Sequence, residues 1–118
     1  MESVKLKVVG IGLLALSLMG FPLAGLAEEP VYKITIKDHK FLPEALTIPS
    51  NTKVKIVVEN FDSTAEEFES YDLRREKVVS AHGEIIIFIG PLKAGVYKYF
   101  GDFHQQTAQG RIVAGENG

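Results

Sequence analysis

The 118-residue sequence contains no cysteine, and this absence excludes more kinds of site than any other feature of the composition. The chain can form no disulfide and no thiolate metal site, so a blue copper centre, which requires a cysteine sulfur, is ruled out. A glycine-rich phosphate loop, a nucleophile elbow and an HExxH helix are also absent. Three serines, Ser63, Ser70 and Ser80, have no local signature of a catalytic triad around them. A hydrolase therefore has little support.

The sequence also lacks an excess of positive charge. Its formal net charge is −2, with 13 basic and 15 acidic residues. No basic field of the kind that nucleic-acid binding requires is present. Because a small domain without disulfides must draw its stability from burial, we expect a well-packed apolar core.

The first 27 residues have the layout of a secretory signal peptide. Lys5 and Lys7 give a basic start, an apolar stretch follows, and the small residues before the acidic pair at 28–29 end at Ala27. We expect cleavage after Ala27, export to the periplasm and a single mature domain over residues 28–118. Loss of Lys5, Lys7 and Glu2 would take the net charge from −2 to −3. The alternative is an uncleaved anchor, since the apolar run approaches the length that spans a bilayer.

The rest of the chain predicts about eight short strands separated by turn residues. Alternation of apolar and polar residues indicates strands in 31–38 and 53–60. Further strands are expected at 45–49, 66–70, 76–81, 84–90, 95–100 and 110–115. Their close spacing is typical of a β-sandwich or barrel. The apolar run Ile85–Ile89 predicts a strand covered on both faces or one that switches sheets. Residues 63–76 alone could hold a helical turn.

Side chains with metal-ligand chemistry gather in two places. One holds Glu66, Glu67, Glu69, Asp72 and Glu76, and the other holds Asp102 and His104. On a strand, Glu67 and Glu69 share one face while Phe68 takes the other, and Asp102 and His104 have the same relation around Phe103. Two such pairs on neighbouring strand ends would join about three carboxylates and one imidazole. Such ligands suit iron(II), manganese, zinc or copper(II), and disfavour copper(I).

A second interpretation of the same residues involves no metal. The glutamates would form a solvated acidic loop balanced by Arg74, Arg75 and Lys77, with His104 an ordinary surface histidine. Of the other histidines, His39 at the end of the first strand is a weaker ligand candidate or a solvated turn residue, and His82 is expected in a hairpin turn.

The order of several motifs resembles the cupredoxin family. Phe41 and Pro43 precede a strand that ends with Leu46, Ile48 and Pro49, and Val58, Asn60 and Asp62 follow at the family's spacing. The closing hairpin and strand match at Gly95, Tyr97, Tyr99, Gly110, Ile112 and Val113. The resemblance covers nearly all of residues 31–115 and implies an all-β Greek-key sandwich of seven to eight strands. It is closer still to the periplasmic cupredoxin-like proteins that accompany iron permeases, and to the N-terminal domain of EfeO-type iron-uptake proteins.

The resemblance also locates a metal site. Blue copper cupredoxins use a histidine after the Asn-x-Asp loop, then a cysteine, a second histidine and usually a methionine. In this chain Glu66 takes the first histidine position, Gly101 the cysteine position and His104 the second histidine position, while the methionine position falls near Gln109. Only His104 is kept, so the resemblance does not imply blue-copper electron transfer.

The iron-uptake relatives imply a different ligand set. Their Glu-aromatic-Glu motif, which supplies acidic ligands, aligns with Glu67 and Glu69, and an ungapped count places Asp102 at a ligand position. We therefore expect Glu67, Glu69, Asp102 and His104 as metal ligands, with Glu66 and Glu76 as further candidates. The resemblance implies an exported protein that binds iron(II), or copper(II) assisting iron oxidation, for a membrane iron permease. The alternatives are a metal chaperone and a metal-free interaction module.

Overall fold

The computed structural model describes residues 29–115, so the predicted leader and its cleavage after Ala27 lie outside the described residues. Nine strands fold into two sheets, with one short 3-10 turn near the end of the chain. Their bounds are β1 Val31–Lys37, β2 Lys40–Leu42, β3 Ala45–Pro49, β4 Val54–Asn60, β5 Glu66–Ser70, β6 Arg75–Val79, β7 Glu84–Ile89, β8 Gly95–Gly101, η2 Asp102–His104 and β9 Gln109–Gly115. Within these residues no helix has the length and apolar character needed to cross a bilayer.

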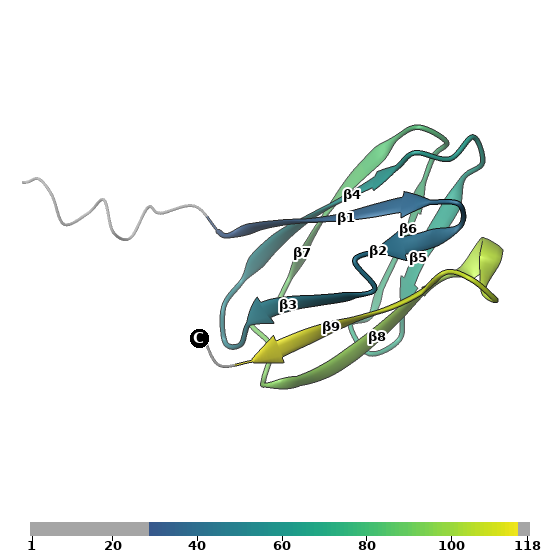
Figure 1. The fold of residues 1–118 in the computed structure, drawn as a ribbon. Helices are drawn as coiled ribbons and strands as arrows, with labels where there is room; N and C mark the ends of the chain where they lie inside the picture. Colours follow the sequence, from purple (N-terminus) through teal and green to yellow (C-terminus); the bar gives the residue numbers. More distant parts are fainter. Residues whose placement is uncertain (1–28, 116–118) are drawn as a thin grey trace, which may run out of the picture.

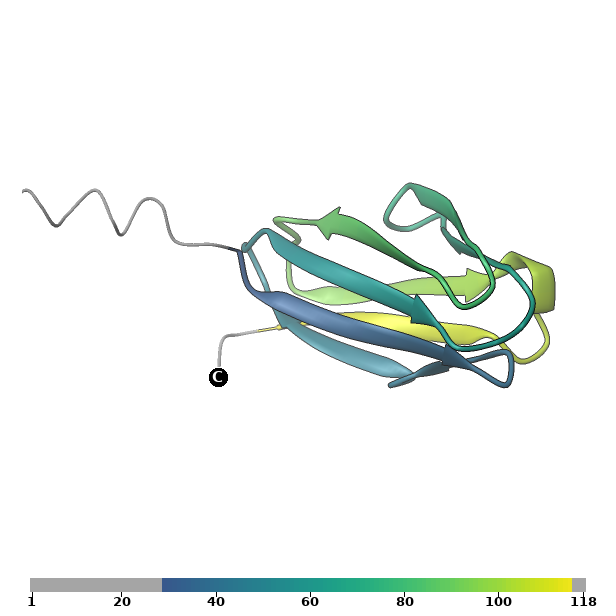
Figure 2. The same ribbon diagram turned by 90° about the horizontal axis from the view of Figure 1, so that it is seen from above.

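The two sheets stack face to face as a sandwich (Figures 1 and 2). One sheet has the order β2-β1-β4-β7 and the other β3-β9-β8-β5-β6. The pairs β1–β4 and β3–β9 are parallel, and the remaining pairs are antiparallel. The predicted all-β Greek-key sandwich is confirmed. The turn η2 caps one end of the sandwich, while β9 ends at the other (Figure 1).

Alternation of buried and exposed residues along the strands builds the core. In β4, Val54, Ile56 and Val58 are fully buried, while the alternate residues Lys55, Val57 and Glu59 are partly exposed. Three aromatic side chains lie in the core: the Phe68 and Tyr99 rings stack at 4.8 Å between centroids, and Phe41 meets both edge-on. Such pairs add about 0.5–1.5 kcal/mol beyond their buried area. Phe68 therefore anchors β5 to the core between the flanking glutamates.

The sequence missed two elements and misjudged a third. β2 is only three residues long and follows a turn in which Asp38 and His39 both have positive φ. The turn η2 follows β8 where a loop was expected. β7 is an edge strand of one sheet with Ile86 and Phe88 exposed, so both predicted alternatives for the run 85–89, a strand covered on both faces and one that switches sheets, were wrong. Its apolar side chains alternate between the core and the surface, which a continuous apolar run does not reveal.

The Arg75 side chain connects the two sheets at this edge. Its Nη2 donates to the Phe88 carbonyl of β7 at 2.9 Å, and its Nη1 donates to the carbonyls of Leu73 and Arg74. Lys53 lies over the Phe88 ring at 5.2 Å from its centroid. The hydrogen bonds of Arg75 thus go to backbone carbonyls and not to the glutamates that it was expected to balance.

Gly110 of β9 provides a test of the core packing. A Cβ added there would lie 2.5 Å from the Tyr99 ring, whereas a Cβ at Gly115 on the same strand would meet nothing within 4 Å. We expect Gly110→Ala to lower the free energy of unfolding by about 1–3 kcal/mol because the buried ring must move. Gly115→Ala is the matched control and should differ from wild type by less than about 0.5 kcal/mol. Urea unfolding measures both, and equal effects at the two positions would contradict this account of the packing.

Candidate metal site and the Glu66–His104 pair

β5 directs its glutamates to opposite faces of the sheet. Glu66, Phe68 and Ser70 are buried, whereas Glu67 and Glu69 are half-exposed on the outer face. The predicted face shared by Glu67 and Glu69 opposite Phe68 is confirmed. Because neighbouring residues of a strand point to opposite sides, the six candidate ligands do not form one cluster.

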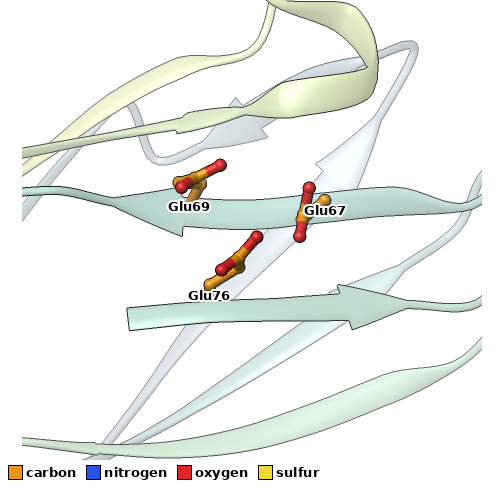
Figure 3. Close-up of side chains that lie close together, drawn as sticks. All are labelled: Glu67, Glu69 and Glu76. Carbon is orange, nitrogen blue, oxygen red and sulfur yellow. The ribbon is translucent and has the colours of Figure 1, made fainter. Parts of the chain in front are cut away.

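Three of the candidates meet on the outer face. Glu67 and Glu69 of β5 and Glu76 of β6 each offer a carboxylate oxygen within 4.8 Å of the others (Figure 3). Pairing between the strands explains the arrangement, since Glu69 lies directly opposite Glu76. We call Glu67, Glu69 and Glu76 the outer glutamate cluster. Like charges directly opposite each other destabilise a strand pair, so the cluster carries an electrostatic cost.

The electrostatics of the cluster confirm this crowding. A hydrogen bond to Glu76, followed by burial and the negative charges of Glu76, Glu69 and Asp102, raises the pKa of Glu67 to about 7. Burial and the charges of Glu76 and Asp102 also raise the pKa of Glu69. Of the ion pairs within residues 29–115, none includes a member of the cluster. Below about pH 7 the cluster therefore relieves part of its repulsion by binding a proton at Glu67.

Asp102 lies beside the cluster without joining it. It follows Gly101, which pairs with Phe68 of β5, and its charge acts on both Glu67 and Glu69. Its Oδ1 accepts a hydrogen bond from Gln105 Nε2 at 2.8 Å. The predicted proximity of Asp102 to the two glutamates is thus present, but the oxygens within mutual ligand distance are those of Glu67, Glu69 and Glu76.

Glu66 and His104 form a separate pair inside the end of the sandwich. His104 Nδ1 lies 2.7 Å from Glu66 Oε2, and the Glu66 side chain is 2% exposed. The other carboxylate oxygen accepts hydrogen bonds from the backbone N–H of Glu67 at 2.9 Å and of Phe103 at 2.8 Å. The Nδ1 atom of His104 therefore contacts Glu66 and not the outer glutamate cluster.

The glycine at 101 makes room for this pair. A Cβ there would lie 2.5 Å from Glu66 Cδ and 2.7 Å from the Ala108 Cβ. Glu66, Gly101 and His104 are the three positions that the cupredoxin resemblance equates with the histidine, cysteine and histidine ligands of blue copper. The structure brings these three positions together. A carboxylate, a glycine and an imidazole do not fit a blue copper centre, which needs a thiolate.

His39 comes closer to this place than the sequence indicated. Its ring stacks on His104 at 3.6 Å between centroids. Asp62 holds the turn that carries it, because its carboxylate accepts hydrogen bonds from the backbone N–H of Asp38 and His39. The buried Asn60 amide in turn donates to the carbonyls of Thr64, Val79 and Ser80. The Asn-x-Asp motif thus positions His39. This motif was the feature of the sequence that could have indicated that His39 lies near His104.

Comparisons with known proteins agree with this architecture. Residues 10–114 match the family described as cupredoxin-like domain. An uncharacterized protein of Rickettsia prowazekii is 55% identical over 84 residues, which are 71% of this chain and 67% of that protein.

Solved structures resemble the fold at low sequence identity. Auracyanin A, a "blue" copper protein from Chloroflexus aurantiacus, has a TM-score of 0.63 at 13% identity, covering 75% of this chain and 100% of that one. The metal-binding domain of a Cu(I)-exporting P-type ATPase from Streptococcus pneumoniae, solved with Cu(I), has a TM-score of 0.65 at 13% identity, covering 76% and 91%. A purple cupredoxin from Nitrosopumilus maritimus has a TM-score of 0.56 at 21% identity, covering 71% and 99%.

The raised pKa of Glu67 predicts how stability changes with pH. Between the ordinary pKa of 4.5 and the raised value of about 7, the folded protein binds more protons at Glu67 than the unfolded chain does. This contribution to stability is therefore present at low pH and lost as the pH rises through about 7. We expect Glu67→Gln to be more stable than wild type at about pH 8 and to gain less at about pH 5.

Urea unfolding at the two pH values measures this difference. Glu84→Gln, at an exposed glutamate of β7 in the other sheet, is the control and should keep the wild-type pH dependence. An equal gain from Glu67→Gln at both pH values would show that repulsion in the cluster does not act on the folded state.

Proposed function

This chain belongs to the cupredoxin-like domain family, and we propose that it is an exported member that binds a hard metal ion, iron(II) in the first place, at the outer glutamate cluster. The observation that carries the proposal is the approach of three carboxylate oxygens to within 4.8 Å of one another on two paired strands. Asp102 adds negative charge to the same place and is a further ligand candidate.

The chemistry of the donors favours a hard cation. Carboxylate oxygens suit iron, manganese and copper(II), whereas copper(I) prefers sulfur. A bound cation would take the place of the proton that Glu67 and Glu76 share and would relieve the repulsion across the Glu69–Glu76 pair. Anionic oxygen ligands bind iron(III) more strongly than iron(II), so such a site would favour the oxidised state. This supports either a carrier or a ferroxidase-like partner.

The pathway is proposed from the resemblance to proteins that accompany iron permeases. The protein would enter the periplasm after cleavage near Ala27 and present iron to a membrane permease. The exposed position of the outer glutamate cluster supports delivery, because a partner can reach it without opening the core.

The second candidate function is a metal-free interaction module. One observation favours it: Glu66 and His104, which the resemblance aligns with two copper ligands of blue copper proteins, are hydrogen-bonded to each other. On this account the outer glutamates form an acidic docking surface. Direct metal titration distinguishes the two functions.

We expect the purified domain, residues 28–118, to bind iron(II) under anaerobic conditions, with manganese(II) as a redox-inert probe. Glu67→Gln, Glu69→Gln and Glu76→Gln should each weaken binding at least about tenfold, equivalent to about 1.4 kcal/mol, because each removes one anionic ligand. Isothermal titration calorimetry measures the affinity. Glu84→Gln is the matched control and should bind as wild type does. If neither ion binds above background, the interaction module is correct. If all four variants bind as tightly as wild type, the metal lies elsewhere and the outer glutamate cluster is not its site.

A second prediction concerns iron uptake in cells. We expect deletion of the gene to reduce iron(II) uptake at low external iron. Expression of the wild-type protein, with its presence in the periplasm checked, should restore uptake. Glu67→Gln/Glu76→Gln should not restore uptake, because it removes two of the three cluster carboxylates, whereas Glu84→Gln should. Uptake that is unchanged by the deletion would remove the permease from the proposal while leaving the metal site to the titration.

A further inference from the structure

The segments around Glu66 are far apart in sequence and meet at one point. The Glu66 carboxylate lies at the start of β5, and its partners Phe103 and His104 lie in η2, 37 and 38 residues further along the chain. In blue copper proteins the ligands come from the equivalent two segments, so a metal ion ties them together. In this chain the Glu66 side chain connects the two segments.

The hydrogen bonding of Glu66 is complete enough for a buried charge. Its two oxygens contact two backbone N–H donors and the Nδ1 atom of the His104 imidazole. Burial of a charged group is costly unless it is paired and hydrogen-bonded, and bonds to a charged acceptor are about twice as strong as neutral ones. The fold thus fixes the position of the carboxylate, and the carboxylate in turn connects β5 to η2.

Glu66 also organises the loop that closes the end of the sandwich. Gly101 N donates to the Ala108 carbonyl at 2.9 Å, and Ala108 N donates to the His104 carbonyl at 2.9 Å, which makes residues 101–108 a compact loop. The Phe103 N–H and the His104 ring of this loop both turn toward Glu66. The space that a side chain at 101 would need is filled by the Glu66 carboxylate.

We infer that the Glu66–His104 pair is a metal-free latch: it fills the position at which blue copper proteins hold their metal, ties β5 to the loop 101–108, and makes this end of the fold independent of a metal ion. The inference does not depend on the proposed function, because the latch and the outer glutamate cluster lie on opposite faces of β5.

The latch fixes the tautomer of His104, and this gives a direct readout. An ionised Glu66 only accepts hydrogen bonds, so the proton of the neutral ring lies on Nδ1. In Glu66→Gln the backbone N–H groups of Glu67 and Phe103 hold the amide oxygen, which turns the amide nitrogen toward the ring. The amide nitrogen can only donate, so the proton should move to Nε2.

The experiment uses nitrogen-15 NMR of the histidine rings and thermal unfolding of the domain freed of metal by a chelator. In wild type we expect His104 to carry its proton on Nδ1, and neither its signals nor the melting temperature should respond to the chelator. Added zinc(II), a diamagnetic probe, should leave the Nδ1 proton in place and should not shift the Nε2 signal either. Glu66→Gln should melt about 5–10 °C lower, since a charge-assisted bond is lost, and should show the Nε2 tautomer.

Glu67→Gln, one residue further along β5, is the matched control and should keep the wild-type tautomer. A shift of the Nδ1 or the Nε2 signal of His104 on addition of zinc(II), with a rise in melting temperature, would overturn the inference, because His104 would then be a metal ligand at this position, and a histidine whose Nδ1–H is held by a carboxylate can still bind a metal through Nε2. An Nε2 tautomer in metal-free wild type would overturn it as well. Both outcomes are read from wild type, so the test holds even if Glu66→Gln does not fold.

Discussion

The burial of one carboxylate, that of Glu66, is the constraint to which the end of the sandwich conforms. A charge with 2% side-chain exposure must find donors on every side, and here they come from its own strand, from Phe103 and from His104. That demand explains why position 101 is a glycine, since any Cβ would collide with the carboxylate. It also explains why the chain turns into η2 directly after β8, because the turn brings the Phe103 N–H inward. The conformation of residues 101–104 thus satisfies the hydrogen bonding of the Glu66 carboxylate.

The strand that carries Glu66 also separates two kinds of chemistry. Glu66 faces the buried interior, where hydrogen bonds satisfy it, while Glu67 faces the outer side, where other carboxylates lie close to it. One residue of displacement along β5 thus changes a carboxylate from a structural group into one that shares a proton with its neighbour. The core packing of Phe68 between them fixes the register, so neither glutamate can change faces without exposing an aromatic ring.

Much of the fold could be predicted from the sequence, because eight of the strands show alternation or are bounded by turn residues. β2 could not, since three residues carry too little periodicity and the turn before it depends on Asp62, over twenty residues away. The shared face of Glu67 and Glu69 followed from strand geometry. The pairing of Glu66 with His104 did not, because local spacing contains no information on contacts between residues 38 positions apart. Alignment with the ligand positions of a known family pointed to the same place for a different chemical reason.

The edge strand β7 presents Ile86 and Phe88 outward and has β4 as its one neighbour in the sheet. Such an edge is a template on which a strand of another molecule can extend the sheet. The guanidinium of Arg75 occupies the Phe88 carbonyl, and Lys53 covers the adjoining ring with a positive charge. A strand added to this edge would have to displace the Arg75 guanidinium and approach the charge of Lys53. These two basic side chains therefore lie where a strand added to this edge would have to pair.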